Sequence, residues 1–311
     1  MFARHNLLTI DDLTNAEIEQ TLSTAQSFKE INEREIKKLP TLRGLTVINA
    51  FFEPSTRTRT SFEIAGKRLG ADVINFSSSG SATAKGESLA DTAATLDAMA
   101  CDIVVVRHRY SGAPALLAGR MRGHIINGGD GMHQHPTQTL LDLFTMQEHI
   151  GTVKGKTIGI VGDIAHSRVA GSLAPALKRL GATPVFIAPP TYLPAVPEEL
   201  GAEVAYALDD ILADLDVVYL LRIQGERADG RAVPSLREYA THFGMNRLRM
   251  ERLGAGAIVM HPGPMNRGVE ISADVADDAR CVVLDQVTAG VAVRMALMYL
   301  MVGGGTDVAA T

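Results

Sequence analysis

Short apolar runs alternate with segments of helical spacing along almost the whole of this 311-residue chain. The run at 103–106, Ile-Val-Val-Val, is apolar at every position, which is typical of a strand covered on both faces. Strands that are separated by helices pair in parallel, because each crossover helix returns the chain to the same end of the sheet. The alternation therefore predicts an α/β fold in which parallel β-sheets are flanked by helices.

The expected elements fall into two groups along the chain. In the first half, strands are expected at 45–52, 72–76, 102–107 and 124–127. In the second half, they are expected at 156–161, 183–187, 203–206, 216–221, 257–260 and 281–284. Helices are expected at 88–99, 136–149, 168–180 and 286–302, and a capping-box pattern at Thr14 and Glu17 predicts one more near the N-terminus.

The length predicts two domains in one chain. We place the first domain at 1–149 together with 287–311, and the second domain at 150–286. Each should contain one parallel sheet. Bridging helices should join the two domains, and one of them should begin at Pro136.

The composition argues against several classes of partner. Hydrophobic residues make up 46% of the chain and the formal net charge is −5, so the surface lacks the basic excess of a nucleic-acid-binding protein. Two cysteines, Cys101 and Cys281, are too few for a disulfide framework or a structural zinc site. The N-terminus shows no signal-peptide pattern, and the apolar run at 287–302 contains Arg294 and falls short of a membrane span. We expect a soluble, cytoplasmic protein with no metal, cofactor, nucleic-acid partner or membrane contact.

The turn after the first expected strand is rich in hydroxyls and guanidiniums. It reads Ser55-Thr56-Arg57-Thr58-Arg59. Where a strand passes into a helix, free backbone N–H groups and the helix dipole favour an anion, and hydroxyl and Arg donors add directional bonds to phosphate. As an alternative, Thr60 and Glu63 could form a capping box beside solvated arginines. Capping explains one hydroxyl and neither arginine, so the turn predicts a phosphate site.

Two further strand ends carry polar side chains. One expected strand ends in Arg107-His108, and the next leads through 127–131 to His135 and Gln138. Taken alone, Arg107 fits a surface ion pair better, and His135 fits a hydrogen-bonded residue at a helix start as well as a catalytic one. Ligands of parallel sheets bind beyond the carboxyl ends of the strands, so three such ends in succession predict a shared site.

Five motifs follow one another along the chain: Ser55-Thr56-Arg57-Thr58-Arg59, Lys85-Gly86-Glu87, Arg107-His108, His135-Pro136-Thr137-Gln138 and His261-Pro262-Gly263-Pro264. Together they resemble the motif set of the aspartate/ornithine carbamoyltransferase family. The segment at 221–227, Leu-Arg-Ile-Gln-Gly-Glu-Arg, is similar to the aspartate-binding loop of the aspartate-specific catalytic chains. The similarity covers nearly the whole chain. The first motif alone would indicate only carbamoyl phosphate binding.

The resemblance implies that the first half of the chain binds carbamoyl phosphate. Thr58, Arg107 and His135 would be catalytic, as donors to the carbamoyl oxygen while negative charge grows on it. Gln138 would orient the carbamoyl amide, and the leaving phosphate would accept the proton of the amine. The complete implied binding set is Ser55, Thr56, Arg57, Thr58, Arg107, His135, Gln138, Gly263 and Pro264, of which the last two would act through backbone carbonyls.

The resemblance also implies an acceptor site in the second half. A dicarboxylate is best held by two separate guanidinium forks, and Arg168 and Arg222 each follow an expected strand. The implied aspartate-binding set is Lys85, Arg168, Arg222 and Gln224. Lys85 lies in a long loop at 77–87 that would reach a neighbouring subunit in a homotrimer with shared active sites.

The implied reaction is transfer of the carbamoyl group from carbamoyl phosphate to L-aspartate, in pyrimidine (UMP) biosynthesis. An ornithine or other amino-acid carbamoyltransferase is the main alternative, but Pro262 and Gly263 stand where ornithine enzymes carry Cys and Leu. A non-catalytic carbamoyltransferase-like subunit is the second alternative. A dehydrogenase is the third, because Gly159-x-x-Gly162 is an incomplete dinucleotide fingerprint. Regulatory chains or a dihydroorotase as further partners stay open.

Overall fold

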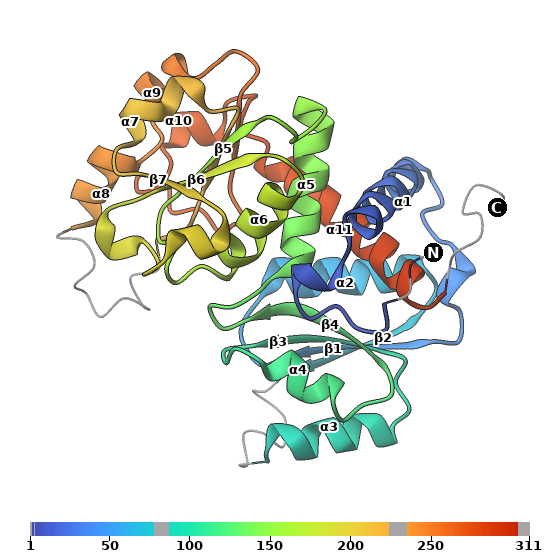
Figure 1. Cartoon of the computed structure of the whole chain (residues 1–311). Helices are drawn as coiled ribbons and strands as arrows, with labels where there is room; N and C mark the ends of the chain where they lie inside the picture. The colour runs from blue at the N-terminus through green and yellow to red at the C-terminus, as the bar shows by residue number, and fades with distance from the viewer. Residues whose placement is uncertain (1, 3, 78–86, 224–234, 304–311) are drawn as a thin grey trace. The chain divides into compact units, whose positions relative to one another are not determined.

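The computed structural model describes residues 2, 4–77, 87–223 and 235–303 (Figure 1). The chain forms two units. Unit 1 comprises Met1–Phe144 and Val287–Thr311, and unit 2 comprises Thr145–Gln286. Two helices, α5 (Pro136–Ile150) and α11 (Val283–Met301), have residues in both units.

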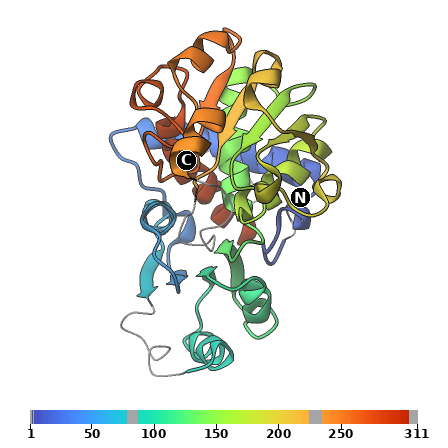
Figure 2. The same ribbon diagram turned by 90° about the vertical axis from the view of Figure 1, so that its left-hand side faces the viewer.

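Unit 1 is built on a parallel sheet of four strands in the order β2-β1-β3-β4. The strands are β1 (Thr46–Phe51), β2 (Asp72–Ser77), β3 (Ile103–His108) and β4 (His124–Asp130). Helix α2 (Thr56–Arg68) covers one face of this sheet. Helices α3 (Leu89–Ala98) and α4 (Ala113–Ala118) cover the other, as both views show (Figures 1 and 2).

Alternation along the strands decides which side chains reach each face. Val104 and Val106 of β3 pack with Leu96 of α3 and Leu117 of α4 in one buried cluster. Because successive side chains of a strand point to opposite faces, Arg107 belongs to the other face, which α2 covers. The register of one strand therefore sends this guanidinium to the side of the sheet where α2 begins.

Unit 2 contains a parallel sheet of five strands in the order β7-β6-β5-β8-β9. The strands are β5 (Thr157–Val161), β6 (Thr183–Ile187), β7 (Glu203–Ala205), β8 (Val217–Leu220) and β9 (Ile258–Met260). Its helices are α6 (Arg168–Arg179), α7 (Leu208–Ile211), α8 (Leu236–Phe243), α9 (Arg247–Arg252) and α10 (Ala273–Ala276). The predicted fold class, two parallel sheets flanked by helices, is confirmed.

One expected strand was wrong. Residues 281–284 do not form a strand, because α11 already begins at Val283. Cys281 makes only an isolated bridge with Val259, and Val282 N–H donates to the Val259 carbonyl at 3.0 Å. A short apolar run does not distinguish a last bridge from the first turn of a buried helix.

Helix α11 is also longer and more apolar than expected. Its 19 residues have a mean hydropathy of 1.3 over the most apolar window, which satisfies the length and composition of a membrane span, and no other helix in the described parts of the chain does. However, 72% of that window is buried inside the protein. The helix therefore has the length and composition of a membrane span, but most of it is buried inside the protein, as in a core helix.

The predicted N-terminal helix is present as α1 (Asn15–Glu33), and its capping box is confirmed. Thr14 accepts from the Glu17 backbone N–H, and the Glu17 carboxylate accepts from the Thr14 N–H at 2.9 Å. Arg4 Nε also donates to Glu17, at 2.9 Å. Burial alone would raise the pKa of Glu17, but the bonds from Arg4 and Thr14 outweigh it and lower this pKa to about 2.

We expect Glu17→Gln to lower the free energy of unfolding at neutral pH by about 2 kcal/mol. This is less than the whole pKa shift would give, because Arg4 is 38% exposed and solvent screens the ion pair. Because folding lowers the pKa of Glu17, its ionised carboxylate stabilises the folded state at pH values above the ordinary pKa of Glu. This stabilisation is lost as the pH falls towards about 2. Urea unfolding of wild type and variant between pH 7 and pH 4 measures the difference, which should shrink as the pH falls. Glu19→Gln, at an exposed position of the same helix, is the control. A difference that does not depend on pH would contradict the assignment.

Candidate active site

In unit 1 the strand order places a ligand crevice between β1 and β3. The chain passes from β1 outward to β2 and then returns to β3 and β4 on the other side. Open parallel sheets bind ligands where the direction of strand addition reverses, at the carboxyl ends of the strands. The predicted phosphate turn follows β1 and Arg107 lies near the end of β3, so both border this point.

The phosphate turn forms the start of helix α2. Ser55 is its N-cap residue and makes no capping bond with its side chain. The first turn carries no acidic residue, so the positive end of the helix dipole is not compensated within the helix. Thr56 and Arg57 are exposed, whereas Thr58 is buried. This helix start is suited to bind an anion with backbone N–H groups and hydroxyls.

The alternative capping box at Thr60 and Glu63 is wrong. Both residues lie inside α2, which begins at Thr56, one turn earlier than that box requires. The Glu63 carboxylate instead accepts from Lys67 Nζ at 2.6 Å and from Asn75 Nδ2 at 2.8 Å. Capping therefore does not account for the hydroxyls of the turn.

Arg107 is held in place by three bonds within unit 1. Its Nε donates to Glu53 Oε1 at 2.7 Å, and its Nη1 lies 3.4 Å from Thr58 Oγ1 and 3.2 Å from the Gly128 carbonyl oxygen. The Arg107 and Glu53 side chains are only 15% and 13% exposed, so this is not the surface ion pair that Arg107 alone suggested. The Thr58 oxygen accepts from Arg107, which leaves the Thr58 O–H free to donate to a ligand.

Glu53 is a residue of the site that the sequence did not reveal as such. It lies two residues before Ser55, the N-cap residue of α2, and its carboxylate accepts a hydrogen bond from Arg107 Nε. Its carboxylate fixes the guanidinium, because a bond to Nε leaves the Nη side of the planar fork facing Thr58. The only available signal was an acidic residue next to a basic anion motif, which does not by itself name a partner.

The third strand end is organised by Asp130 at the end of β4. The Asp130 carboxylate, 1% exposed, accepts from the backbone N–H groups of Gly112 and Gln134 and from Asn127 Nδ2. These bonds fix the turn that leads into α5. His135 immediately precedes that helix and Gln138 lies in its first turn, and both side chains are buried, at 4% and 7% exposure.

In unit 2 the strand order reverses between β5 and β8. Arg168 is the first residue of α6, which follows β5, and its side chain is 7% exposed. Arg222 comes two residues after the end of β8. The two arginines predicted to bind a dicarboxylate therefore follow the two strands that border the second switch point.

Gly159 in β5 and Gly162 just after it have packing roles. A Cβ on Gly159 would lie 2.7 Å from the Leu215 side chain, and one on Gly162 would lie 3.0 Å from Leu221 Cβ. Gly162 also has a φ of +131°, where other residues are strained. Close strand-end packing thus explains both glycines, and the dinucleotide-fingerprint alternative gains no support.

Glu270 links two loops of unit 2, the one that contains Arg222 and Ile223 and the one that contains Asn266. Its buried carboxylate accepts from the Ile223 N–H at 2.7 Å, next to Arg222, and from the Asn266 N–H at 2.8 Å. Burial raises the pKa of Glu270 above its usual range. Gly263, in the predicted backbone-carbonyl motif, has a φ of +69°, a conformation that favours glycine. Lys85 and Gln224 lie outside the described residues.

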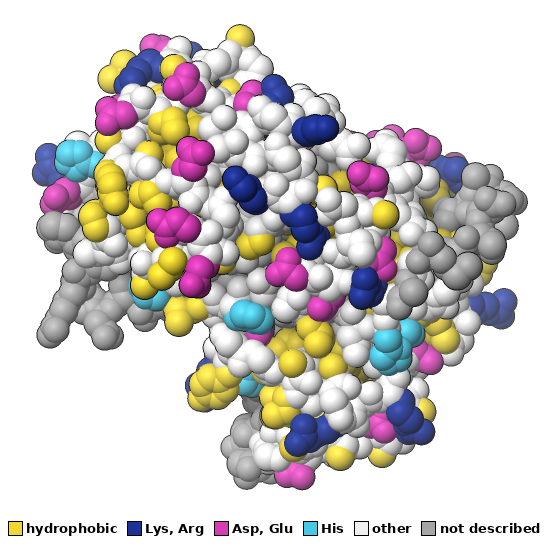
Figure 3. Space-filling model, in the orientation of Figure 1, with side chains coloured by type: hydrophobic (Ala, Val, Ile, Leu, Met, Phe, Trp, Pro, Cys, Tyr) yellow, Lys and Arg dark blue, Asp and Glu magenta, His cyan; other side chains and the backbone are white. Residues whose placement is uncertain are grey.

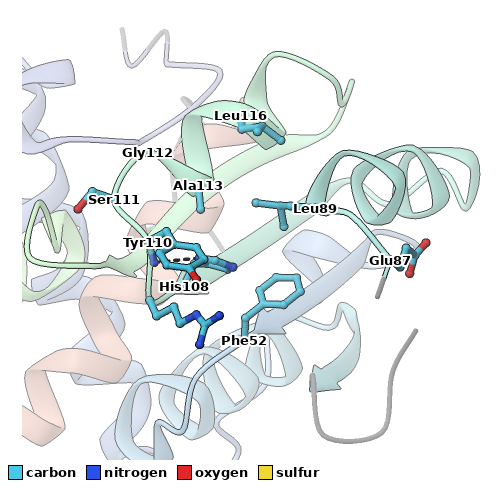
Figure 4. Close-up of a pocket in the computed structure, with 10 residues that line it drawn as sticks. Phe52, Glu87, Leu89, His108, Tyr110, Ser111, Gly112, Ala113 and Leu116 are labelled. Carbon is cyan, nitrogen blue, oxygen red and sulfur yellow. Dashed lines mark hydrogen bonds between the residues drawn. The ribbon is translucent and has the colours of Figure 1, made fainter. Parts of the chain in front are cut away.

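A pocket of about 720 Å³ lies on the opposite face of the unit 1 sheet from Arg107 (Figure 4). His108, Phe52 and Tyr110 line it beside Leu89 and Leu116. The Tyr110 N–H donates to His108 Nδ1 at 3.0 Å. Burial lowers the pKa of His108, and the nearby Arg109 charge lowers it further. Alternation along β3 explains why His108 lines this pocket while its neighbour Arg107 belongs to the α2 side.

The surface agrees with a site whose basic charge is local. On the face shown in Figure 3, Lys and Arg side chains are interspersed with Asp and Glu. Within the described residues, no three His, Cys, Asp or Glu side chains form a group that could hold a metal ion. Taken together, the observations define an α/β protein with two parallel sheets and arginine-bearing strand ends in each of its two units.

Comparison with known proteins identifies the family. Residues 5–148 match the carbamoyl-phosphate-binding domain, and residues 154–301 match the Asp/Orn-binding domain, of the aspartate/ornithine carbamoyltransferases. The chain belongs to this family. It is 55% identical over 302 residues to the aspartate carbamoyltransferase catalytic subunit of Acidothermus cellulolyticus, covering 97% of this chain and 93% of that protein.

Solved structures agree with this assignment. The aspartate transcarbamoylase of Trypanosoma cruzi, in complex with N-(phosphonacetyl)-L-aspartic acid, is 32% identical with a TM-score of 0.87, covering 96% of each chain. The catalytic subunit of aspartate transcarbamoylase from M. jannaschii is 36% identical with a TM-score of 0.85, covering 97% of this chain and 100% of that one.

Proposed function

We propose that this chain transfers the carbamoyl group from carbamoyl phosphate to the amine of L-aspartate, which gives N-carbamoyl-L-aspartate and phosphate. The observation that carries this proposal is the 55% identity, over 97% of the chain, to a relative named as an aspartate carbamoyltransferase catalytic subunit. The arrangement of this chain supports the same proposal, because the start of α2 with Arg107 is suited to a phosphate in unit 1 and Arg168 and Arg222 are suited to a dicarboxylate in unit 2.

Most of the residues proposed to bind carbamoyl phosphate belong to unit 1, and two, Gly263 and Pro264, belong to unit 2. Its phosphate would lie at the start of α2, where backbone N–H groups, hydroxyls and a guanidinium meet the requirements of a doubly charged anion. The residues proposed for this ligand are Ser55, Thr56, Arg57, Thr58, Arg107, His135 and Gln138, with the carbonyls of Gly263 and Pro264 as further acceptors. The bonds of Arg107 to Glu53 and Thr58 support this role, because they orient the guanidinium before the ligand arrives.

The chemistry needs no nucleophilic side chain. The amine nitrogen of aspartate attacks the carbamoyl carbon, the new C–N bond forms, and the C–O bond to phosphate breaks. Negative charge grows on the carbamoyl oxygen during the attack, and Thr58, Arg107 and His135 would donate to it. The departing phosphate takes the electron pair of the broken bond and the amine proton. Catalysis would come from orientation and electrostatics.

L-Aspartate would be bound by residues of unit 2. Arg168 and Arg222 each present a guanidinium that can pair with one carboxylate, so together they favour a dicarboxylic acceptor over a cationic one such as ornithine. Gln224 and Lys85 complete the proposed set. The assembly of Glu270, Ile223 and Asn266 supports the role of Arg222, because it fixes the backbone immediately after this residue.

The activity is tested by supplying carbamoyl phosphate with L-aspartate or with L-ornithine in separate reactions. We expect carbamoyl-aspartate to form at a kcat/KM at least about 10³ times that for ornithine, because ornithine leaves the carboxylate-binding guanidinium unpaired and places a cation beside it. Turnover of ornithine without turnover of aspartate would refute the proposed function.

The family resemblance also supports a homotrimer in which Lys85 serves the active site of a neighbouring subunit. Arg57→Ala and Lys85→Ala chains should each be almost inactive alone. When equal amounts are mixed and reassembled at random, about one quarter of the sites should contain both native residues and recover activity. Reassembled mixtures without activity, from chains that do assemble, would contradict shared sites.

We further propose that the enzyme acts in the cytoplasm, in pyrimidine biosynthesis. Carbamoyl-aspartate contains the atoms of a pyrimidine ring before its closure, which supports a role early in that route. Loss of the gene should then make growth depend on added uracil or uridine. Growth without either would contradict this role.

A further inference from the structure

Two buried charged residues behind Gln138 have no role in the chemistry described above. Asp142, one turn further along α5, is 0% exposed, and Arg294 of α11 is 3% exposed. Both belong to unit 1. Removing a carboxylate and a guanidinium from water is costly unless their charges and bonds are used, so their position next to a proposed ligand-binding residue needs a reason.

The bond between Gln138 and Asp142 fixes the direction of the Gln138 amide. Its Nε2 donates to Asp142 Oδ1 at 3.0 Å. An ionised carboxylate can only accept, so the NH₂ end of the amide must face Asp142. The carbonyl oxygen, Oε1, is thereby turned towards the other side, where it can accept a bond from a ligand.

Arg294 keeps this arrangement charged. Its guanidinium packs 5.0 Å from the Phe62 ring, and its Nη1 donates to the Gly290 carbonyl at 3.1 Å. A Cβ at Gly290 would lie 2.5 Å from Nη1, so a larger residue there would force the guanidinium to shift. Burial lowers the pKa of Arg294 to about 9, which the Asp142 charge opposes, so the guanidinium remains protonated at neutral pH.

The direction of the amide matters for the choice of substrate. The carbamoyl group of carbamoyl phosphate carries an NH₂, whereas acetyl phosphate has a methyl group in the same place. A carbonyl oxygen facing this position can accept from the NH₂ and gains nothing from the methyl. An amide NH₂ facing it would repel the carbamoyl NH₂, because two donors would meet.

Resting on the proposed function, we propose that Asp142 and Arg294 are positioning residues. They lock the Gln138 amide with its oxygen towards the carbamoyl NH₂, and so make the site select carbamoyl phosphate over acyl phosphates that lack this group. The three residues act in sequence: the Arg294 charge acts on Asp142, Asp142 holds the Gln138 amide through the Nε2 bond, and the amide oxygen contacts the carbamoyl NH₂.

Calorimetric binding of carbamoyl phosphate and of acetyl phosphate to the full-length protein tests this proposal. In Asp142→Asn the carboxylate becomes an amide of equal size, which can also donate, so Gln138 can reverse. We expect about tenfold weaker binding of carbamoyl phosphate and a change of less than about twofold for acetyl phosphate. Gln138→Leu should lose the same selectivity, and the double variant should lose no more than either single one.

Matched variants separate positioning from folding. Arg294→Lys keeps the cation and should retain most of the selectivity, whereas Arg294→Met should lose it; this pair decides the question if Asp142→Asn fails to fold. Thr139→Val, which removes a buried hydroxyl of α5 and leaves the Gln138 and Asp142 side chains in place, should leave the ratio unchanged. Equal weakening of both ligands, or unchanged selectivity in folded Asp142→Asn and Arg294→Met, would overturn the proposal. Turnover of aspartate by the wild type is measured separately, so a failure of the proposed function is recognised independently.

Discussion

Replacing Arg107 by methionine should lower kcat by about 10³, because the change removes one preorganised donor to the growing negative charge and the positive charge that supports it. The structure supports a large effect at this position, because the guanidinium is mostly buried and is fixed by Glu53, Thr58 and the Gly128 carbonyl. Steady-state kinetics with carbamoyl phosphate and aspartate measures the loss.

Two further variants show that the loss is local. Arg107→Met removes the ion pair with the Glu53 carboxylate, which is 13% exposed, so the fold should weaken as well. Adding Glu53→Gln should restore thermal stability but not activity. Arg109, two residues after Arg107, serves as the control. Arg109→Met removes a guanidinium that lies over the Tyr110 ring and should change kcat by less than about threefold. Comparable losses in Arg107→Met and Arg109→Met would refute a specific role for Arg107.

Arg168→Met should raise the KM for aspartate by about 100-fold while the KM for carbamoyl phosphate changes little, because a desolvated guanidinium–carboxylate pair contributes to acceptor binding alone. Arg168 is suited to this role by its burial at the start of α6, next to the Ser167 cap. Lys178→Met, at an exposed position in the last turn of the same helix, is the control and should leave both KM values near those of the wild type. A parallel rise in both KM values would show that the change acts through the fold instead.

Much of the fold could be predicted from local pattern. Apolar runs bounded by turns identified β1, β3, β5 and β8, because buried parallel strands are apolar on both faces. The failure at 281–284 has a physical reason: four apolar residues are compatible with a strand or a buried helical turn, and the packing of α11 decides for the helix. The start of α2 at Thr56 was hidden for a similar reason, since Ser55 as cap competes with Thr60 in the sequence.

The site residues also divide into those that the sequence pattern could predict and those that it could not. Residues that follow strands, such as Thr58 and Arg107, could be predicted to meet, because parallel strands bring their carboxyl ends to one edge. Their bond confirms that these two side chains lie together. Glu53 and Arg294 could not be assigned, because the bond of Glu53 to Arg107 and the electrostatic interaction of Arg294 with Asp142 both join segments distant in the sequence. Lys85 and Gln224 remain predictions.

The most direct test of the account is a competition between acceptors. Wild-type protein is given ¹³C-labelled carbamoyl phosphate with L-aspartate and L-ornithine at equal concentration, and the labelled products are resolved by mass. We predict carbamoyl-aspartate as essentially the sole product, with citrulline below about one part in 10³. Citrulline as the main product, or release of labelled cyanate and phosphate without transfer to either amine, would contradict the account.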